Sequence, residues 1–259
     1  MKSPNSKKEH GIVAILDALG AANYSDEEIM RFIDSREQVM QLLEEKALKI
    51  GDAILPGMLK TFTFNDTVLI ILRTRAIPPT LDQITKFFTL MRKFFVDSLE
   101  YGILFRGAVA LGEFYLNDDT NTVLGNAVTD AAAWYDKADW IGIHATPRAS
   151  LIIQQMTQNS SQSKKEHLIL NYAVPVKDGR CIPLKAVNWP KVFNVPALTP
   201  CQSGEEPKEK LLQFLSNHRI PFGTEGKFAN TIAFFDYAMS TIQKSNPVKP
   251  LGPNTRARL

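Results

Sequence analysis

The sequence has few of the residues that build metal–sulfur sites or disulfide frameworks. Among its 259 residues there are two cysteines, Cys181 and Cys201, and they do not form a CxxC pair. The four histidines show no HxxxH or HExxH spacing, which argues against a zinc site. P-loop, GxGxxG and GxSxG motifs are also missing. These absences disfavour zinc proteins, disulfide-rich secreted proteins and the common nucleotide-loop folds.

Charge excess and long apolar runs are missing as well. Lysine and arginine total 30 against 27 acidic residues, and a net charge of +3 is too small to indicate a nucleic-acid-binding surface. No apolar run reaches the length of a membrane span, and the polar start MKSPNSKKEH lacks the apolar region of a signal peptide. We therefore expect no nucleic-acid partner, no membrane partner and a cytoplasmic location.

Two carboxylates stand at the ends of apolar strands. Residues 11–17, GIVAILD, form an apolar run that ends on Asp17 and is followed at once by a flexible turn. Residues 58–64 and 67–72 are apolar segments that flank Asn65-Asp66, which predicts a β-hairpin although the turn lacks its favoured glycine. One aspartate therefore lies at the turn after the first of these strands, and another lies at the hairpin turn.

The expected order of elements places these two aspartates together. A capping box at Ser25 predicts a helix that ends near Gly51, and a second one at Thr80 predicts a helix that stops at Gly102. A long strand over 103–116 follows, giving strand, helix, strand, strand, helix, strand. This is the ferredoxin-like βαββαβ plan, an α/β (α+β) fold with an antiparallel sheet. In it the third strand lies beside the first, so Asp17 and Asp66 become neighbours that a divalent cation would separate.

Taken singly, each aspartate also has a purely structural interpretation. Asp17 is a possible turn cap, and Asp66 is a residue that hairpin turns favour in any protein. The pair carries more weight, because both follow apolar strands and the topology brings them to one edge.

Four segments carry a resemblance to a known family: AILDALG (14–20), FTFNDTVLII (62–71), FRGAVALGE (105–113) and LGNAVTDA (124–131). They resemble, in order, the first metal-binding strand, the hairpin with the second metal aspartate, the strand into the dimer arm and the glycine-to-helix segment of class III nucleotide cyclases. The residues of these segments are most similar to those of the pyrimidine cyclases of bacterial Pycsar anti-phage systems. The resemblance covers about residues 11–150.

The resemblance implies a homodimer that converts a nucleoside triphosphate into a 3′,5′-cyclic monophosphate and pyrophosphate. Asp17 and Asp66, with the backbone carbonyl of Ala18, would hold two Mn²⁺ or Mg²⁺ ions per site. One ion would activate the ribose 3′-hydroxyl, and the other would neutralise the phosphates. Backbone amides of Leu19, Gly20 and Ala21, and of the following Ala22, would contact the phosphates. A second messenger of this kind implies an effector protein that senses it.

The sequence departs from the family at the residues that steady the triphosphate. The family carries an asparagine and an arginine where this chain has Thr129 and Ala133. We expect Arg106 to supply the missing cation, although an arginine on an apolar strand is more often a structural ion pair. Lys177 lies in a hairpin similar to one that bears a phosphate lysine in the family, but a solvated turn residue is the simpler interpretation.

The base-reading positions also depart from the purine-specific pattern. They map to Phe62 and Thr122, so the charged pair that reads adenine is absent. Phe62 narrows the pocket and offers a stacking surface, while Thr122, with Asn121 beside it, can bond a small base edge. We expect a pyrimidine substrate, with UTP favoured over CTP.

The sequence predicts that the chain has three parts. We expect a nucleotide cyclase catalytic domain over residues 1–192, a helical C-terminal extension over 193–245 and a disordered tail over 246–259. Two other functions stay open. Polymerase palms share the fold and the paired aspartates, but the near-neutral charge disfavours a template binder. A catalytically inactive, nucleotide-binding cyclase homologue would fit Thr129 and Ala133.

Overall fold

A computed structural model describes residues 7–21, 24–49, 57–158, 168–218, 220 and 223–245. The predicted end of the first helix near Gly51, the phosphate contact expected of Ala22 and the predicted disordered tail 246–259 lie outside these residues.

The first six elements follow the predicted βαββαβ order. They are β1 (Lys7–Ala18), α1 (Asp26–Lys49), β2 (Leu59–Phe64), β3 (Thr67–Thr74), α2 (Leu81–Glu100) and β4 (Phe105–Asn117). Their strands lie side by side as β2-β3-β1-β4, and every neighbouring pair is antiparallel. This is the strand order of a ferredoxin-like sheet, so the predicted fold is confirmed.

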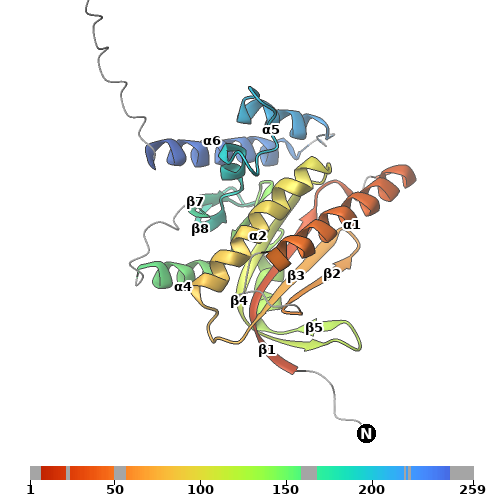
Figure 1. Ribbon diagram of the computed structural model, residues 1–259, viewed down its shortest axis with the longest axis vertical. Coiled ribbons are helices and arrows are strands. Elements are labelled where there is room, and N and C mark those ends of the chain that lie inside the picture. Colours follow the sequence, from red (N-terminus) through yellow and green to blue (C-terminus); the bar gives the residue numbers. More distant parts are fainter. Residues whose placement is uncertain are drawn as a thin grey trace, which may run out of the picture.

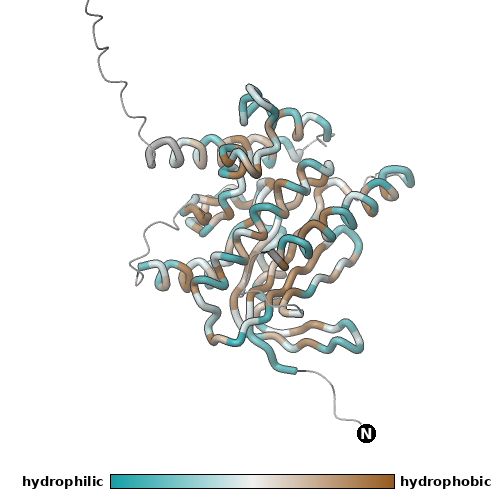
Figure 2. The backbone as a smooth tube through the Cα atoms, in the orientation of Figure 1, coloured by the Kyte–Doolittle hydropathy of each residue, from teal (hydrophilic) through white to brown (hydrophobic). Residues whose placement is uncertain are grey.

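Helices α1 and α2 lie next to each other across one face of this sheet (Figure 1). Both begin at the predicted capping boxes, where Ser25 exchanges hydrogen bonds with Glu28 and Thr80 with Gln83. Alternate residues of β1 point into the core beneath them, including Ile12, Ala14 and Leu16, all fully buried. Figure 2 shows the hydrophobic colour along the strands behind these helices.

The intervening residues of the same strands point to the opposite face, which we call the arm face. Its buried cluster includes Val13, Ile15, Ile71, Ala110 and Phe114. It is covered by α3 (Asn126–Trp134) and by β5 (Thr122–Leu124), which pairs with the end of β4 to form a hairpin arm. The arm, which begins at β4, reaches across to β2: Asp118 near its tip pairs with Lys60 of β2 at 2.6 Å.

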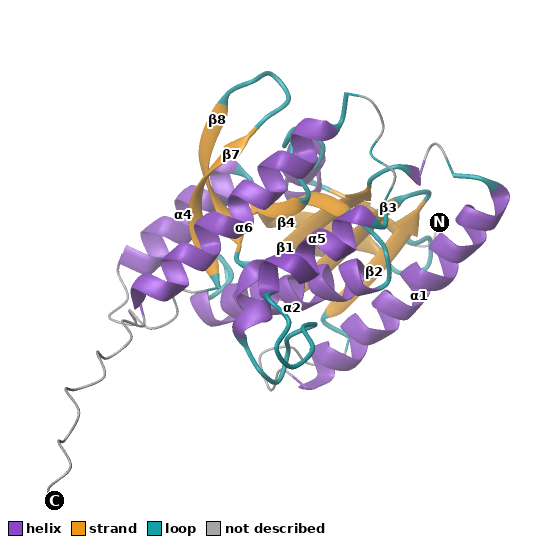
Figure 3. Cartoon of the chain, turned by 90° about the horizontal axis from the view of Figure 1, so that it is seen from above, coloured by secondary structure: helices purple, strands orange, loops and turns teal. Residues whose placement is uncertain are grey.

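The rest of the chain extends the sheet and joins the same core. The sheet continues through β6 (Gly142–Ala145), β8 (Cys181–Val187) and β7 (Ile169–Pro175), and the remaining helices are α4 (Pro147–Gln158), η3 (Trp189–Asn194), α5 (Pro207–Ser216) and α6 (Glu225–Ser245). Leu211 of α5 and Phe234 of α6 belong to one buried cluster with residues of β1. Helix α6 lies beside β7 (Figure 3).

The sequence also predicts a helix over residues 125–139 and a short strand over 140–145, and one boundary of each was wrong. The helix expected to run to Asp139 ends at Trp134, and the strand expected from Trp140 begins at Gly142. The intervening backbone bonds elsewhere: the Asp139 N–H donates to the Pro175 carbonyl at 2.8 Å, and the Lys177 N–H donates to the Lys137 carbonyl at 3.0 Å. Since these tertiary hydrogen bonds satisfy the backbone, the segment stays non-helical. Across the described ranges, no helix is both long and apolar enough to cross a membrane.

Candidate active site

The pairing of β1 with β3 brings Asp17 and Asp66 to one edge of the sheet, as predicted. Asp17 lies opposite Thr67, and the Ala18 N–H donates to the Asp66 carbonyl at 3.0 Å. The hairpin turn closes without glycine because Asn65 takes a φ of 53°, which asparagine tolerates better than most residues. Asn65 also donates its side-chain amide to Asp66 Oδ1 at 3.1 Å.

On the other side of β1, Arg106 of β4 lies directly opposite Asp17. Its Nε and Nη2 both donate to Asp17 Oδ2, at 3.1 and 2.9 Å. The two side chains are 12% and 15% exposed, so this is a largely desolvated ion pair. Strand alternation places both residues on the arm face, with Ile15 and Ala110. Oδ1 of Asp17 takes no part in the pair.

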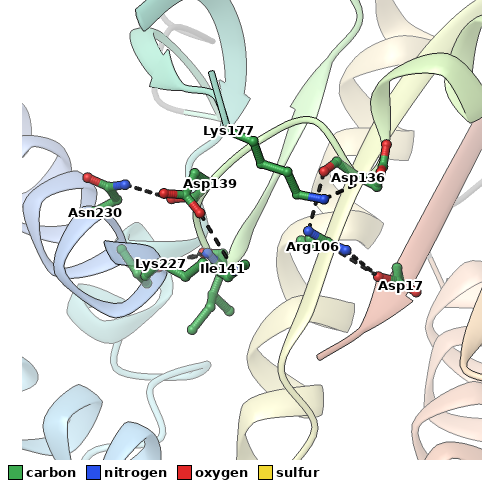
Figure 4. A network of polar contacts seen from close by, with 9 residues as sticks. Asp17, Arg106, Asp136, Asp139, Ile141, Lys177, Lys227 and Asn230 are labelled. Carbon is green, nitrogen blue, oxygen red and sulfur yellow. Dashed lines mark hydrogen bonds and ion pairs between the residues drawn. The ribbon is translucent and has the colours of Figure 1, made fainter. Parts of the chain in front are cut away.

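A third carboxylate, Asp136, joins the site from the turn after α3. Its backbone carbonyl accepts a hydrogen bond from Arg106 Nη1 at 3.3 Å, and its carboxylate pairs with Lys177 Nζ at 3.4 Å. Figure 4 shows the chain of contacts from Asp17 through Arg106 and Asp136 to Lys177. The sequence interpretation missed Asp136, since it fell within the predicted helix 125–139. Lys177 is a turn residue that is 44% exposed, in agreement with the simpler interpretation, and its side chain also joins this network.

The surroundings of Asp17 disfavour its ionised form. Burial raises the pKa of Asp17, Arg106 offsets only part of that rise, and the charges of Asp66 and Asp136 add to it. Burial alone would raise the pKa of Asp136, but Lys177, Lys137 and Arg106 outweigh it and the pKa lies below its usual value. A cation bound beside Asp17 would therefore relieve an unfavourable charge.

The donor set is of the chemical kind that binds a divalent cation. Carboxylates and backbone carbonyls are the hard oxygen ligands that Mg²⁺ and Mn²⁺ prefer, and Asp17, Asp66 and Ala18 supply them. Among the residues that the structure describes, however, no group of three or more acidic, histidine or cysteine side chains could hold a metal. Magnesium is commonly held by one or two carboxylates together with waters or substrate phosphates, so these protein ligands would need such additional oxygens to complete a site.

The turn after β1 contains the backbone amides for which the sequence predicts phosphate contacts. Gly20 takes a φ of 92°, which favours glycine, and is exposed. The Leu19 N–H already donates to the Leu104 carbonyl at 2.9 Å, which leaves the predicted phosphate contact to the amides of Gly20 and Ala21. Tyr24 lies over this turn and donates its hydroxyl to the Leu19 carbonyl at 3.4 Å.

The predicted base-reading residues border the arm face. Phe62 of β2 packs against its buried cluster, as does Val123, the neighbour of Thr122 in the arm. Thr122 itself is exposed and bonds Thr120 through its hydroxyl at 2.9 Å. Thr129, on α3, is also exposed. The specificity assigned to these side chains remains a prediction.

Comparison with known proteins gives similarity in structure only. Neither the family models nor the curated proteins compared with the chain give a match. Among solved structures, the adenylyl cyclase CyaB from P. aeruginosa is similar at 13% identity and a TM-score of 0.43, over 70% of this chain and 95% of that one. The catalytic core of a rhodopsin-guanylyl cyclase with converted specificity, in complex with ATPalphaS, is similar at 16% identity and 0.43, over 70% and 97%. Similarity at this level establishes neither family nor activity.

Proposed function

We propose that the protein is a nucleotide cyclase that converts a pyrimidine nucleoside triphosphate into its 3′,5′-cyclic monophosphate and pyrophosphate. The observation that carries this proposal is the convergence of Asp17, Asp66 and Arg106 at one edge of a ferredoxin-like sheet. The residue-level resemblance to class III cyclases supports it at the same positions. In the reaction the 3′-oxygen bonds to the α-phosphorus, the bond to pyrophosphate breaks and the hydroxyl proton is released to solvent.

Asp17, Asp66 and the Ala18 carbonyl are the residues that would hold Mn²⁺ or Mg²⁺. When bound, such ions polarise phosphate oxygens and favour ionisation of the attacking hydroxyl. The carboxylates would provide the negative charge that binds the cations, and the cations would neutralise the phosphates of the nucleotide. Both Arg106 hydrogen bonds go to one oxygen of Asp17, so the other oxygen remains for the cation.

Arg106 and Lys177 are the cations that this chain offers to the phosphates. The positions at which the family carries asparagine and arginine are here Thr129 and Ala133, both exposed on α3. We propose that Arg106 takes over the stabilisation of charge that develops on the triphosphate. Lys177, 44% exposed and held by Asp136, would contact the phosphates as a point charge.

The proposed substrate is UTP, with CTP as the alternative. Phe62 replaces the lysine of adenine-reading relatives, so a purine would leave base-edge groups unpaired at a cost of about 1–3 kcal/mol each. Thr122 and Asn121 can donate to carbonyl oxygens of uracil. The resemblance to Pycsar cyclases further suggests a cytoplasmic homodimer whose product activates an effector protein in anti-phage defence.

A second candidate is a nucleotide-binding homologue without turnover. The ion pair between Arg106 and Asp17 favours it, because a metal would have to share that carboxylate with a buried arginine. In this interpretation the protein binds a nucleotide but does not convert it.

One experiment separates these functions. The full chain is incubated with equimolar ATP, GTP, CTP and UTP and Mn²⁺, and the products are resolved by mass. Cyclic UMP with pyrophosphate is the expected result. A dominant purine product would overturn the pyrimidine assignment, and cyclic CMP would overturn only the preference for UTP. Nucleotide binding without any product would identify the inactive homologue.

A further inference from the structure

We propose that the first turns of α6, in the C-terminal extension, position the cations of the candidate active site. The inference rests on the proposed cyclase function, because it concerns the same Arg106 and Lys177. The link is the segment 135–141 between α3 and β6, which we call the Asp136 loop.

One side of the Asp136 loop belongs to the site. Arg106 Nη1 donates to the Asp136 carbonyl at 3.3 Å, and Lys177 Nζ pairs with the Asp136 carboxylate at 3.4 Å. Both cations therefore take part of their orientation from one loop residue. A displacement of Asp136 would move the Arg106 guanidinium relative to Asp17.

The other side of the Asp136 loop is held by α6 (Figure 4). Asn230 donates its side-chain amide to the Asp139 carbonyl at 2.7 Å, and the Ile141 N–H donates to Thr231 Oγ1 at 2.8 Å. Lys227 Nζ lies 3.7 Å from Asp139 Oδ1. Three residues of α6, spaced i, i+3 and i+4 along the helix, thus bind the loop within five residues of Asp136.

Close packing at this junction leaves little freedom. A Cβ on Gly226 would lie 3.1 Å from Asp139 Oδ2, a tight contact, so the start of α6 lies close against the Asp139 side chain. The Trp140 ring packs edge-on against Phe234 of α6 at 4.7 Å between centroids. Thr231 is 1% exposed. Because a packed interior transmits displacements, the position of α6 fixes the position of Asp136.

The decisive variant is Thr231→Val, which keeps the shape of the side chain and removes the hydroxyl that accepts from Ile141. We expect kcat to fall by about tenfold or more, with a smaller change in KM, because Arg106 acts on charge that develops in the transition state. Thr231→Ser retains the hydroxyl and should restore kcat. Asn230→Ala, at a half-buried position, removes only the bond to Asp139 and should lower kcat in the same sense, even if Thr231→Val does not fold.

The matched control is Tyr237→Phe on the same helix. It removes the hydrogen bond from Tyr237 to the Asn171 carbonyl of β7, at 2.8 Å, and leaves the Asp136 loop untouched. Kinetics are measured well below the melting temperature of every variant, and hydrogen exchange of residues 135–141 is followed in parallel. We expect faster exchange in Thr231→Val and Asn230→Ala and no change in Tyr237→Phe.

The outcomes separate the two proposals. A wild-type protein that turns over none of the four nucleotides overturns the proposed function, and the inference with it. An active wild type whose Thr231→Val and Asn230→Ala variants keep wild-type kcat overturns the inference alone. Equal losses in Tyr237→Phe would also overturn it, since the effect would then be one of general helix docking.

Discussion

Two opposing effects act on the ionisation of the Asp17 carboxylate. Burial and the nearby charges of Asp66 and Asp136 favour its neutral form, whereas the hydrogen bond and charge of Arg106 favour the ionised one. A carboxylate that binds a metal must be ionised, so in the proposed function Arg106 would keep Asp17 ready for a cation while occupying one of its oxygens.

The first prediction concerns the carboxylates. Asp66→Asn should lower turnover by about 100-fold or more, because the amide removes one of the two negative charges at the metal edge. The melting temperature should stay close to that of the wild type, since Asp66 is half-buried at a turn. Asp34→Asn, an exposed site on α1, is the control and should keep full activity. Substantial product formation by Asp66→Asn would contradict the metal assignment.

The second prediction concerns pH. Arg106 lowers the pKa of Asp17, so Arg106→Met should let that pKa rise further. Activity requires ionised Asp17 and is lost as pH falls through its pKa; the acidic limb of kcat/KM should therefore move to higher pH. The measurement is a pH–rate profile of both proteins with Mn²⁺. An acidic limb at unchanged pH would show that Arg106 does not set the pKa on which activity depends.

Residues of the site differ in how far the sequence predicts them. Asp17 and Asp66 are predictable because each follows an apolar strand at a turn, and these are local signals. The ion pair of Arg106 depends on register, which fixes it opposite Asp17 only after β1 and β4 pair. Asp136 carries no local signal, since its hydrogen bonds reach residues 30 and 41 positions away.

At the scale of elements, a helix boundary was predictable where its signal is local. The capping boxes at Ser25 and Thr80 are encoded within four residues, and the structure forms both. The end of α3 is set instead by hydrogen bonds between the Asp136 loop and the hairpin of β7 and β8. The Asp139 N–H donates to the Pro175 carbonyl, and the Lys177 N–H donates to the Lys137 carbonyl. Tertiary hydrogen bonds of this kind override local helix preference.

Strand β6 supports a third prediction, on stability. His144 is fully buried between Ala108 of β4 and Ala186 of β8, and both its ring nitrogens lack a partner among the described groups. Burial lowers the pKa of His144 to about 4 from an ordinary value of 6.5. Between these values the unfolded chain takes up a proton that the folded chain does not, so stability falls as pH falls from 6.5 towards 4.

From pH 7.5 to 5.0 this histidine should cost the wild type about 2 kcal/mol of unfolding free energy. His144→Leu should lose correspondingly less over the same interval, whatever its stability at pH 7.5. Urea unfolding of both proteins at the two pH values measures the difference, in which the other titrating groups cancel. Identical losses would show that His144 is not neutral in the fold.

On the scale of the whole molecule, the arm face contains apolar side chains that one chain does not cover. Phe62, Leu69, Val123 and Val128 are only partly buried against its cluster. Phe64, two residues after Phe62 and therefore on the same face, is 84% exposed beside the candidate site. The back-folding of the arm onto Lys60 could not be predicted, because that contact joins segments far apart in the sequence.

The last prediction is that two copies associate through this face, as the proposed cyclase function requires. Burying a phenylalanine is worth about 1.5–3 kcal/mol, so Phe64→Ser should weaken the dimer by about tenfold or more. Leu151→Ser on α4, at 63% exposure, removes a similar apolar side chain elsewhere and should leave association unchanged. Sedimentation across a dilution series gives the dissociation constants, and specific activity is measured on the same samples. If activity needs the dimer, specific activity should fall at higher concentrations in Phe64→Ser than in the other two proteins. A wild type that sediments as a fully active monomer would contradict both the dimer and a shared active site.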